Sequence, residues 1–344
     1  MRITKPPKSG VFKKKDSTIK DINPIIIKII YLDQNIWIEL AKGWYSKKGE
    51  SYNTVLKLKE KIKNKDLIVV ISIIHFFETL KIKNEKRREN LLNFMMDISE
   101  GNVISPFSEE IINKEIYNMF RRRFSLEEID IKKEIIGKGI PYILGSEWFN
   151  KLIEKYKIPE HLKKQVMNLA SSTKMLKTIF SSPDHIAHNQ KQIEDLNNLK
   201  TKFNEVREKE RIYKDKDFGN RVIMIKYFIW RILPKINEII LRLLLNKDFI
   251  LKKGHTKKDF IKIFQEIPSA YTYFFLIEMR DRNMTRPIHE HDLYDIMSLT
   301  VAIPYCDIVV GEKMFIGIAK QTKLDKIYST ILLSSIKELD KYLT

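Results

Sequence analysis

The amino-acid sequence predicts a three-layer α/β fold with a central parallel sheet, interrupted by a large all-helical insertion. Two nearly continuous β-branched runs, at 25–32 and 67–71, are typical of strands buried on both faces. Helical patterns follow each run, and this β-α-β-α-β rhythm favours right-handed crossovers between parallel strands. Residues 108–265 hold mostly helical patterns and almost no β-type runs, which indicates the insertion.

The chain divides into four segments: a flexible basic arm at 1–22, a first part of the core at 23–106, the helical insertion at 107–265, and a second part of the core at 266–344. In the first part we expect a helix that Ser72 caps and that carries Glu78, strands at 25–32, 67–71 and 103–105, and further helices at 35–43, 52–64 and 86–99. In the second part we expect helices at 269–280, 292–303, 314–321 and 333–342, and strands at 307–311 and 326–329.

The composition narrows the classes of function. A formal net charge of +19 and a pI near 9.6 favour a polyanionic partner, because lysine and arginine side chains that neutralise phosphates release condensed counterions. A lysine-rich proteome would give the same excess, and this alternative stays open. The single cysteine, Cys306, allows neither a disulfide within the chain nor a cysteine zinc site, which fits a reducing cytoplasm.

Two stretches of the sequence argue against a secreted protein and against a membrane-spanning one. The basic N-terminal region lacks the apolar segment of a secretory signal. The most apolar long stretch, 221–245, carries a charge every few residues, which is too costly for a membrane-spanning helix. The sequence contains neither a P-loop nor a dinucleotide-binding glycine motif, so nucleotide-driven chemistry has no support.

Carboxylates gather where the predicted strands end. Ligands of a parallel α/β sheet bind beyond the carboxyl ends of its strands, and Asp33 and Glu312 each end one strand. Glu78 lies two turns into the helix after the second strand, in an otherwise apolar stretch. Asp295 lies in the helix that leads into the strand ended by Glu312, and Asp292 precedes it by one turn on the same face.

This set of acids fits metal-assisted hydrolysis. Carboxylates that converge repel one another and reduce stability unless a cation lies between them. Mg²⁺ and Mn²⁺ prefer oxygen ligands, and one or two carboxylates with water suffice for each ion. Such an ion lowers the pKa of bound water and offsets the charge that develops on a phosphodiester. A single acid at a strand end is more often a helix cap, so the combination is more specific than any one position.

Three parts of the chain resemble PIN domains. Residues 30–37 form an apolar strand followed by Asp, any residue and Asn, which is similar to the opening strand of these domains. Residues 72–80 resemble the second PIN element, an apolar helix with one Glu. Residues 292–314 look like the third and fourth acidic elements of bacterial PIN-like proteins. The resemblance covers roughly half the chain, about 25–105 and 268–342.

The resemblance implies a catalytic metal site for Mg²⁺ or Mn²⁺, formed by Asp33, Glu78, Asp295 and Glu312. It implies that Asn35 orients the first carboxylate, and the further supporting residues are Asp292 and Lys313. Asp292 is also an alternative ligand to Asp295, although the spacing of Asp295 from Glu312 suits one helix plus a strand better. The family pattern has Ser or Thr before a fourth Asp, whereas Gly311 precedes Glu312 here.

Two basic clusters are candidates for contacts with phosphates. They comprise Arg121, Arg122 and Arg123 in the insertion, and Arg280, Arg282 and Arg286 just before the acidic helix. The second cluster would guide a nucleic-acid backbone to the site, and a solvated basic face is the alternative. The neighbouring residues 289–291, His-Glu-His, lack the further ligands of a histidine metal site, so a loop that touches substrate is the better interpretation.

The expected function is therefore a Mg²⁺- or Mn²⁺-dependent endoribonuclease. Many PIN domains are toxins and others mature or degrade RNA, so we expect a toxin or defence effector with an inhibitory antitoxin or a defence-system protein as partner. Two alternatives stay open: a catalytically silent PIN-like module that binds RNA or protein, and a DNA-directed nuclease of the flap type. The RNA target, the oligomeric state and the role of the insertion stay open as well.

Overall fold

A computed structural model describes residues 27–182, 201, 232–242, 257–282 and 289–343. The strands are β1 (Lys28–Leu32), β2 (Leu67–Val70), β3 (Asn102–Ile104), β4 (Ile136–Lys138), β5 (Ile308–Val310) and β6 (Ile331–Leu333). The helices of the first part are α1 (Gln34–Ser46), α2 (Gly49–Lys63), α3 (Ile73–Leu80) and α4 (Glu85–Ser99). The arm expected at 1–22 lies outside the described residues.

The remaining helices fall into two groups along the chain. Those between 107 and 265 are α5 (Glu109–Arg123), α6 (Ile131–Ile135), α7 (Ile140–Ile143), α8 (Ser146–Lys155), α9 (Glu160–Ala170), α10 (Thr173–Ser181), α13 (Leu233–Arg242) and α14 (Lys257–Gln265). Those after 265 are α15 (Pro268–Asp281), α16 (Glu290–Tyr305), α17 (Lys313–Gln321), α18 (Leu324–Tyr328) and α19 (Ile336–Leu343).

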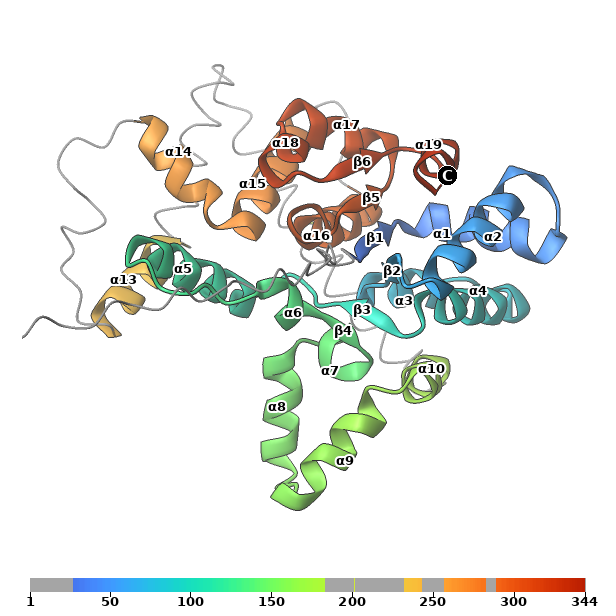
Figure 1. Cartoon of the computed structure of the whole chain (residues 1–344), viewed down its shortest axis with the longest axis horizontal. Coiled ribbons are helices and arrows are strands. Elements are labelled where there is room, and N and C mark those ends of the chain that lie inside the picture. Colours follow the sequence, from blue (N-terminus) through green and yellow to red (C-terminus); the bar gives the residue numbers. More distant parts are fainter. Residues whose placement is uncertain (1–26, 183–200, 202–231, 243–256, 283–288, 344) are drawn as a thin grey trace, which may run out of the picture.

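Four strands form a parallel sheet in the order β2-β1-β5-β6 (Figure 1). The two central strands, β1 and β5, come from the two ends of the chain, so the sheet joins the parts that flank the insertion. Leu32 pairs with Val310 in the register, and these two strands therefore end at the same edge of the sheet. The prediction of an α/β fold with a central parallel sheet is confirmed.

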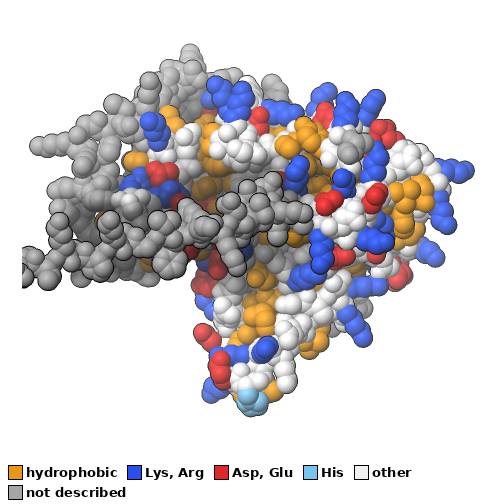
Figure 2. Space-filling view, viewed as in Figure 1, with side chains coloured by type: hydrophobic (Ala, Val, Ile, Leu, Met, Phe, Trp, Pro, Cys, Tyr) orange, Lys and Arg blue, Asp and Glu red, His pale blue; other side chains and the backbone are white. Residues whose placement is uncertain are grey.

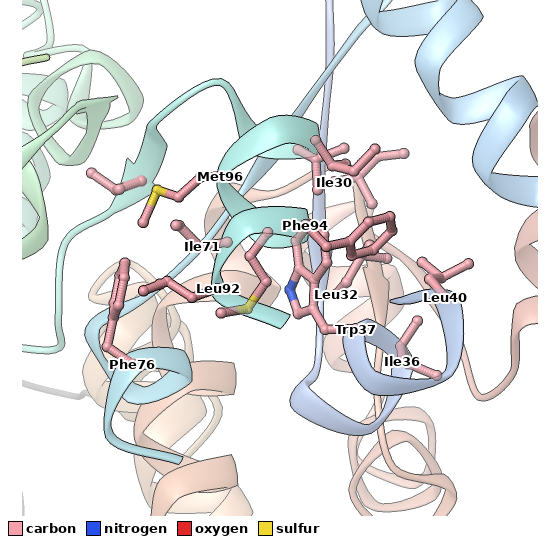
Figure 3. Packing of buried hydrophobic residues seen from close by; sticks show 14 of the residues in the cluster. Ile30, Leu32, Ile36, Trp37, Leu40, Ile71, Phe76, Leu92, Phe94 and Met96 are labelled. Atoms are coloured by element: carbon pink, nitrogen blue, oxygen red, sulfur yellow. The ribbon is translucent and has the colours of Figure 1, made fainter. Parts of the chain in front are cut away.

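Side chains of the sheet alternate between two cores, one on each face. Ile30 and Leu32 belong to a cluster with α1, α2, α4 and α19, whereas Tyr31 belongs to a cluster with α5, α15, α16 and α17. Figure 3 shows Trp37 of α1 packed beside Phe94 of α4, and their ring centroids are 6.0 Å apart. Helices on both faces of the sheet give the three layers that the sequence predicts.

The described part of segment 107–265 shares its core with the rest of the chain. Phe120 of α5 lies in the same cluster as Tyr31, and Phe180 of α10 stacks on Phe76 of α3 with ring centroids 3.8 Å apart. In Figure 1, α8 and α9 project away from the sheet. The helical segment is thus anchored on both faces rather than attached at one point.

One strand in this segment corrects the prediction of an all-helical insertion. Residues 136–138 form β4, which pairs antiparallel with β3. On its other side, β3 meets the main sheet through a single parallel bridge between Ile71 and Val103. β4 therefore provides the hydrogen bonds that the free edge of β3 would otherwise lack.

The assignment near the C-terminus also differs. The sequence predicts a strand at 326–329, but residues 324–328 form α18 and the strand β6 follows at 331–333. Ser329 adopts a left-handed conformation, with φ of 58°, and ends α18. Two short apolar runs, 324–328 and 331–333, are close together here, and the second becomes a strand because it is the one that pairs with β5.

Within the described ranges, no helix combines the length and the apolar character that crossing a membrane requires.

Candidate functional site

Two of the predicted acids lie side by side at the carboxyl edge of the sheet. Asp33 follows β1 directly and begins α1, and Glu312 follows β5 after one glycine and begins α17. The backbone N–H of Asp33 donates to the carbonyl oxygen of Val310 at 2.8 Å, which continues the pairing of the two strands. The parallel register thus brings together acids that are 279 positions apart in the sequence.

The Asp33 carboxylate is held by backbone donors. Its Oδ1 accepts a hydrogen bond of 2.8 Å from the N–H of Gln34, and the backbone N–H of Glu312 also donates to it. The role expected for Asn35 is not found: Asn35 is exposed, and among the described residues it contributes no hydrogen bond to Asp33. The orientation comes instead from one backbone N–H at the start of α1 and one at the start of α17.

Glu78 and Asp295 approach the same edge from two helices. Glu78 lies on α3, with 13% of its side chain exposed, and Nδ1 of His291 lies 3.4 Å from its Oε1. Asp295 is half-buried one turn into α16. These positions come from helices on either side of the strand ends, as expected of ligands that converge on a switch point in a parallel sheet.

The four carboxylates act on one another electrostatically. Burial, followed by the charges of Asp33, Glu78 and Glu312, raises the pKa of Asp295 to about 10. Burial, followed by the charge of Glu78, raises the pKa of Asp33 to about 7, and Glu312 adds to the increase. The charges of Asp33, Glu78 and Glu312 therefore all act on Asp295, and these four acids at the carboxyl edge of the sheet are called the acidic site below.

Asp292 is bound elsewhere. Its carboxylate lies 2.5 Å from the guanidinium of Arg280, and it also accepts a hydrogen bond of 2.8 Å from the backbone N–H of His289. The Asp292 side chain is 2% exposed. It therefore anchors the first turn of α16 and is corrected from an alternative ligand to a structural residue, which leaves Asp295 as the acid of this helix in the site.

The donor set of this acidic site fits a hard divalent cation. Its members supply carboxylate oxygens, the ligand type that Mg²⁺ and Mn²⁺ prefer. The side-chain oxygen of Gln34, next to Asp33, is buried without a hydrogen-bond partner among the described residues, and a buried oxygen of this kind calls for a water or an ion. No group of three His, Cys, Asp or Glu side chains in the described ranges is arranged to hold a metal as it stands.

The basic residues are placed differently from expectation. Arg280 is 1% exposed and paired with Asp292, so its predicted contact with phosphate is wrong. Arg282 is exposed, and its guanidinium lies 2.7 Å from Glu278. Arg286 lies outside the described residues. Lys313 is exposed at the start of α17, directly after Glu312.

The cluster Arg121–Arg123 lies at the far end of the sheet from the acidic site. Arg122 lines a cavity with Tyr305, the last residue of α16 before β5 begins, whereas the acids lie where the strands end. Arg122 and Arg123 pair with Glu266, and the Nε of Arg121 donates to the carbonyl oxygen of Glu127. These arginines therefore cannot contact a phosphate that is bound at the acidic site.

Sequence reasoning missed a polar network beside the acids. Glu290 lies 2.5 Å from the ammonium group of Lys81 and accepts a hydrogen bond of 2.8 Å from the hydroxyl of Tyr294. The same ammonium group lies 4.3 Å from the centroid of the Tyr294 ring. The network joins the end of α3, which carries Glu78, to the start of α16, which carries Asp295. In the sequence, this network is indicated only by Lys81, the lysine that directly follows the apolar helix.

Comparison with protein-family models, with curated proteins and with solved structures finds no match to this chain. No matched relative therefore adds to what the side chains at the carboxyl edge of the sheet indicate.

Proposed function

We propose that this protein is a metal-dependent endoribonuclease. The observation that carries the proposal is the set of four acids at the carboxyl edge of the sheet, two of which have pKa values raised by burial and by their acidic neighbours. Such an arrangement reduces the stability of the protein on its own and becomes favourable once a cation offsets the repulsion. Strongly perturbed carboxylates of this kind concentrate at functional sites.

Asp33, Glu78, Asp295 and Glu312 would hold Mg²⁺ or Mn²⁺. When bound, the ion would lower the pKa of water and offset the charge that develops on a phosphodiester. The backbone N–H groups of Gln34 and Glu312 orient the Asp33 carboxylate, so this ligand is directed before the ion arrives. The remaining ligand helices are fixed by the Arg280–Asp292 pair and by the Lys81–Glu290 pair.

A nucleic-acid substrate agrees with the charge of the chain. The net charge of the chain is +19. Figure 2 shows that lysine and arginine side chains are spread over the described part of the face that is turned to the viewer. Such a surface attracts a phosphate backbone without regard to sequence. RNA is proposed rather than DNA because of the PIN-like segments, and competition between RNA and single-stranded DNA would separate the endoribonuclease from a flap-type DNA nuclease. A toxin or defence role, with an inhibitory partner protein, is part of the same proposal.

A silent binding module is the second candidate. It is favoured by the absence, among the described residues, of three acidic or histidine side chains arranged to hold a metal. The Glu at position 312, where the family pattern has Asp, points the same way. Calorimetry distinguishes the two candidates, since a silent module binds RNA but no Mn²⁺ at the acidic site.

The test of the proposed activity is incubation of the purified protein with total RNA and Mn²⁺. Asp33→Asn removes a charge from the site while preserving the cap of α1, and Asp97→Asn, at a surface ion pair with Lys59, is the matched control. We expect discrete cleavage by the wild type and by Asp97→Asn, and none by Asp33→Asn or with EDTA. RNA binding without cleavage by the wild type would favour the silent module.

A further inference from the structure

A buried histidine connects two of the elements that carry the acids. His75 lies on α3, is 1% exposed, and contacts the rings of Tyr31 and Trp37, at centroid distances of 5.1 and 6.3 Å. Its Nδ1 lies 2.8 Å from the backbone nitrogen of Ser72, and its Nε2 lies 2.8 Å from the carbonyl oxygen of Leu32. Both ring nitrogens therefore bind backbone groups of other residues.

The hydrogen bonds determine which ring nitrogen carries the proton. The backbone N–H of Ser72 is a donor, so Nδ1 must accept and carries no proton. The carbonyl oxygen of Leu32 is an acceptor, so Nε2–H must donate. Burial lowers the pKa of His75 to about 4, which agrees with a ring that stays neutral at physiological pH.

The two backbone groups lie next to the acidic site. Leu32 is the residue before Asp33, and Ser72 begins the helix that carries Glu78. Pairing of β1 with β2 ends at Tyr31 and Val70, so the carbonyl oxygen of Leu32 lies beyond the last pair of the ladder. The imidazole takes the place of the missing strand partner and joins the end of β1 to α3.

A second hydrogen bond joins α3 to the start of α1, on the other side of the acids along the chain. The side-chain nitrogen of Gln34 donates to the hydroxyl of Thr79 at 2.9 Å, and both side chains are buried. Gln34 follows Asp33 directly, and Thr79 follows Glu78 directly. The two cross-links therefore bracket the pair of acids along both chain segments.

We propose that His75 is a positioning residue of the acidic site, which fixes the separation of Asp33 and Glu78 through its bridge from Leu32 to the start of α3. The role rests on the proposed function, because it matters only if these acids bind a cation together. His75 acts through the backbone and contacts neither acid. Loss of the bridge leaves the carbonyl oxygen of Leu32 without a donor, and the repulsion between the two carboxylates then separates β1 from α3.

A simpler role for His75 is to cap α3 without bridging to Leu32. This role predicts a different response to substitution of His75. The side-chain oxygen of Asn stands at about the position of Nδ1, so His75→Asn keeps an acceptor for the Ser72 N–H but cannot reach Leu32. The side-chain nitrogen of Gln stands at about the position of Nε2, so His75→Gln keeps a donor for the Leu32 carbonyl. The two variants separate the cap from the bridge.

The experiment measures the Kd for Mn²⁺ alone by calorimetry, for the wild type and both variants, after circular dichroism has established that each is folded. We expect His75→Asn to raise the Kd about tenfold or more, the loss typical of residues that orient metal ligands, and His75→Gln to stay close to the wild type. If His75→Asn binds as tightly as the wild type, or if His75→Gln binds as weakly as His75→Asn, the bridging role is overturned and the proposed site is untouched. A wild type that binds no Mn²⁺ refutes both.

A measurement on the wild type does not depend on the folding of any variant. Nitrogen-15 NMR of the histidine side chains reports which ring nitrogen carries the proton. We expect the His75 ring to be neutral and protonated at Nε2, with a ring proton protected from exchange. A ring protonated at Nδ1, or at both nitrogens at neutral pH, would contradict the bridge from Leu32 to Ser72.

Discussion

Arg280 and Asp292 form an ion pair of 2.5 Å in the interior, with 1% and 2% of their side chains exposed. The pair joins α15 to the first turn of α16, and it places Asp295 one turn further along the same helix. It also occupies the Asp292 carboxylate, so Asp295 is the aspartate of α16 that we propose as a ligand. The pair therefore supports the helix that carries Asp295.

Asp292→Asn is predicted to destabilise the protein, whereas its folded fraction should still bind Mn²⁺ saturably, because Asp292 supports the helix of Asp295 and is not proposed as a ligand. Breaking a buried pair by removing one partner leaves an uncompensated charge, which lowers the free energy of unfolding by about 3–5 kcal/mol. Urea unfolding gives the change in stability, and calorimetry gives the metal affinity. The double variant Arg280→Met/Asp292→Leu should be more stable than Asp292→Asn. Wild-type stability with lost Mn²⁺ binding would instead make Asp292 a ligand.

The sequence could locate the candidate acids but not their partners. Asp33 and Glu312 each follow a β-branched run, and Glu78 interrupts an apolar helix, so local patterns were sufficient for these positions. Arg280 and Asp292 look like a phosphate-binding arginine and a metal ligand until α15 packs against α16. Their pairing is a tertiary contact, and a local pattern carries no information about it.

Asp295→Asn is predicted to stabilise the metal-free protein, and more so at high pH. Folding raises the pKa of Asp295 to about 10, far above its usual value. At every pH between the usual value and about 10, the folded state therefore binds more protons than the unfolded state. The free energy of unfolding of the wild type therefore falls as pH rises. The variant does not lose stability in this way, because an Asn side chain does not ionise. Urea unfolding with EDTA should show a gain of at least about 1 kcal/mol at pH 8, smaller at pH 5. Equal stabilities at pH 8 would show that neither burial nor the neighbouring acids raise the pKa of Asp295 in the folded protein.

Mn²⁺ binding is predicted to release protons. Burial and the neighbouring acids raise the pKa values of Asp295 and Asp33, so both carboxyls hold their protons to higher pH than usual, whereas a cation requires the carboxylate forms. The affinity for Mn²⁺ should therefore rise with pH. Calorimetry in two buffers of different ionisation enthalpy measures the released protons directly, because the observed heat then differs between buffers. The same heat in both buffers would mean that the acids are already ionised in the metal-free protein.

Glu115 provides a second, independent pH effect. This carboxyl on α5 accepts hydrogen bonds from the backbone N–H of Ser269 at 2.9 Å and the hydroxyl of Tyr305 at 2.6 Å, yet burial raises its pKa to about 7. The folded state again binds the extra proton, so stability is lost as pH rises from about 5 to above 7. Glu115→Gln should show a smaller loss than the wild type over this range in urea unfolding. An unchanged slope would mean that Glu115 ionises normally.

Contacts between distant parts of the chain explain the other differences from the sequence predictions. The three-residue strand β4 exists because β3 offers it a free edge, and nothing in residues 136–138 alone favours a strand over the helical patterns around it. The bond from His75 to Leu32 spans 43 positions. Only the position of His75, three residues after the capping Ser72, was visible in the sequence as a sign of its role.

The most direct test of the central claim, that the four acids form one site for a divalent cation, is a Mn²⁺ titration by calorimetry. The wild type, Asp33→Asn, Asp295→Asn and the surface control Asp97→Asn should be compared at pH 8, where more of the site is ionised. We predict saturable binding by the wild type and the control, and a loss of binding in both site variants. Binding that survives in Asp33→Asn and Asp295→Asn, or that is absent from the wild type, would contradict the claim.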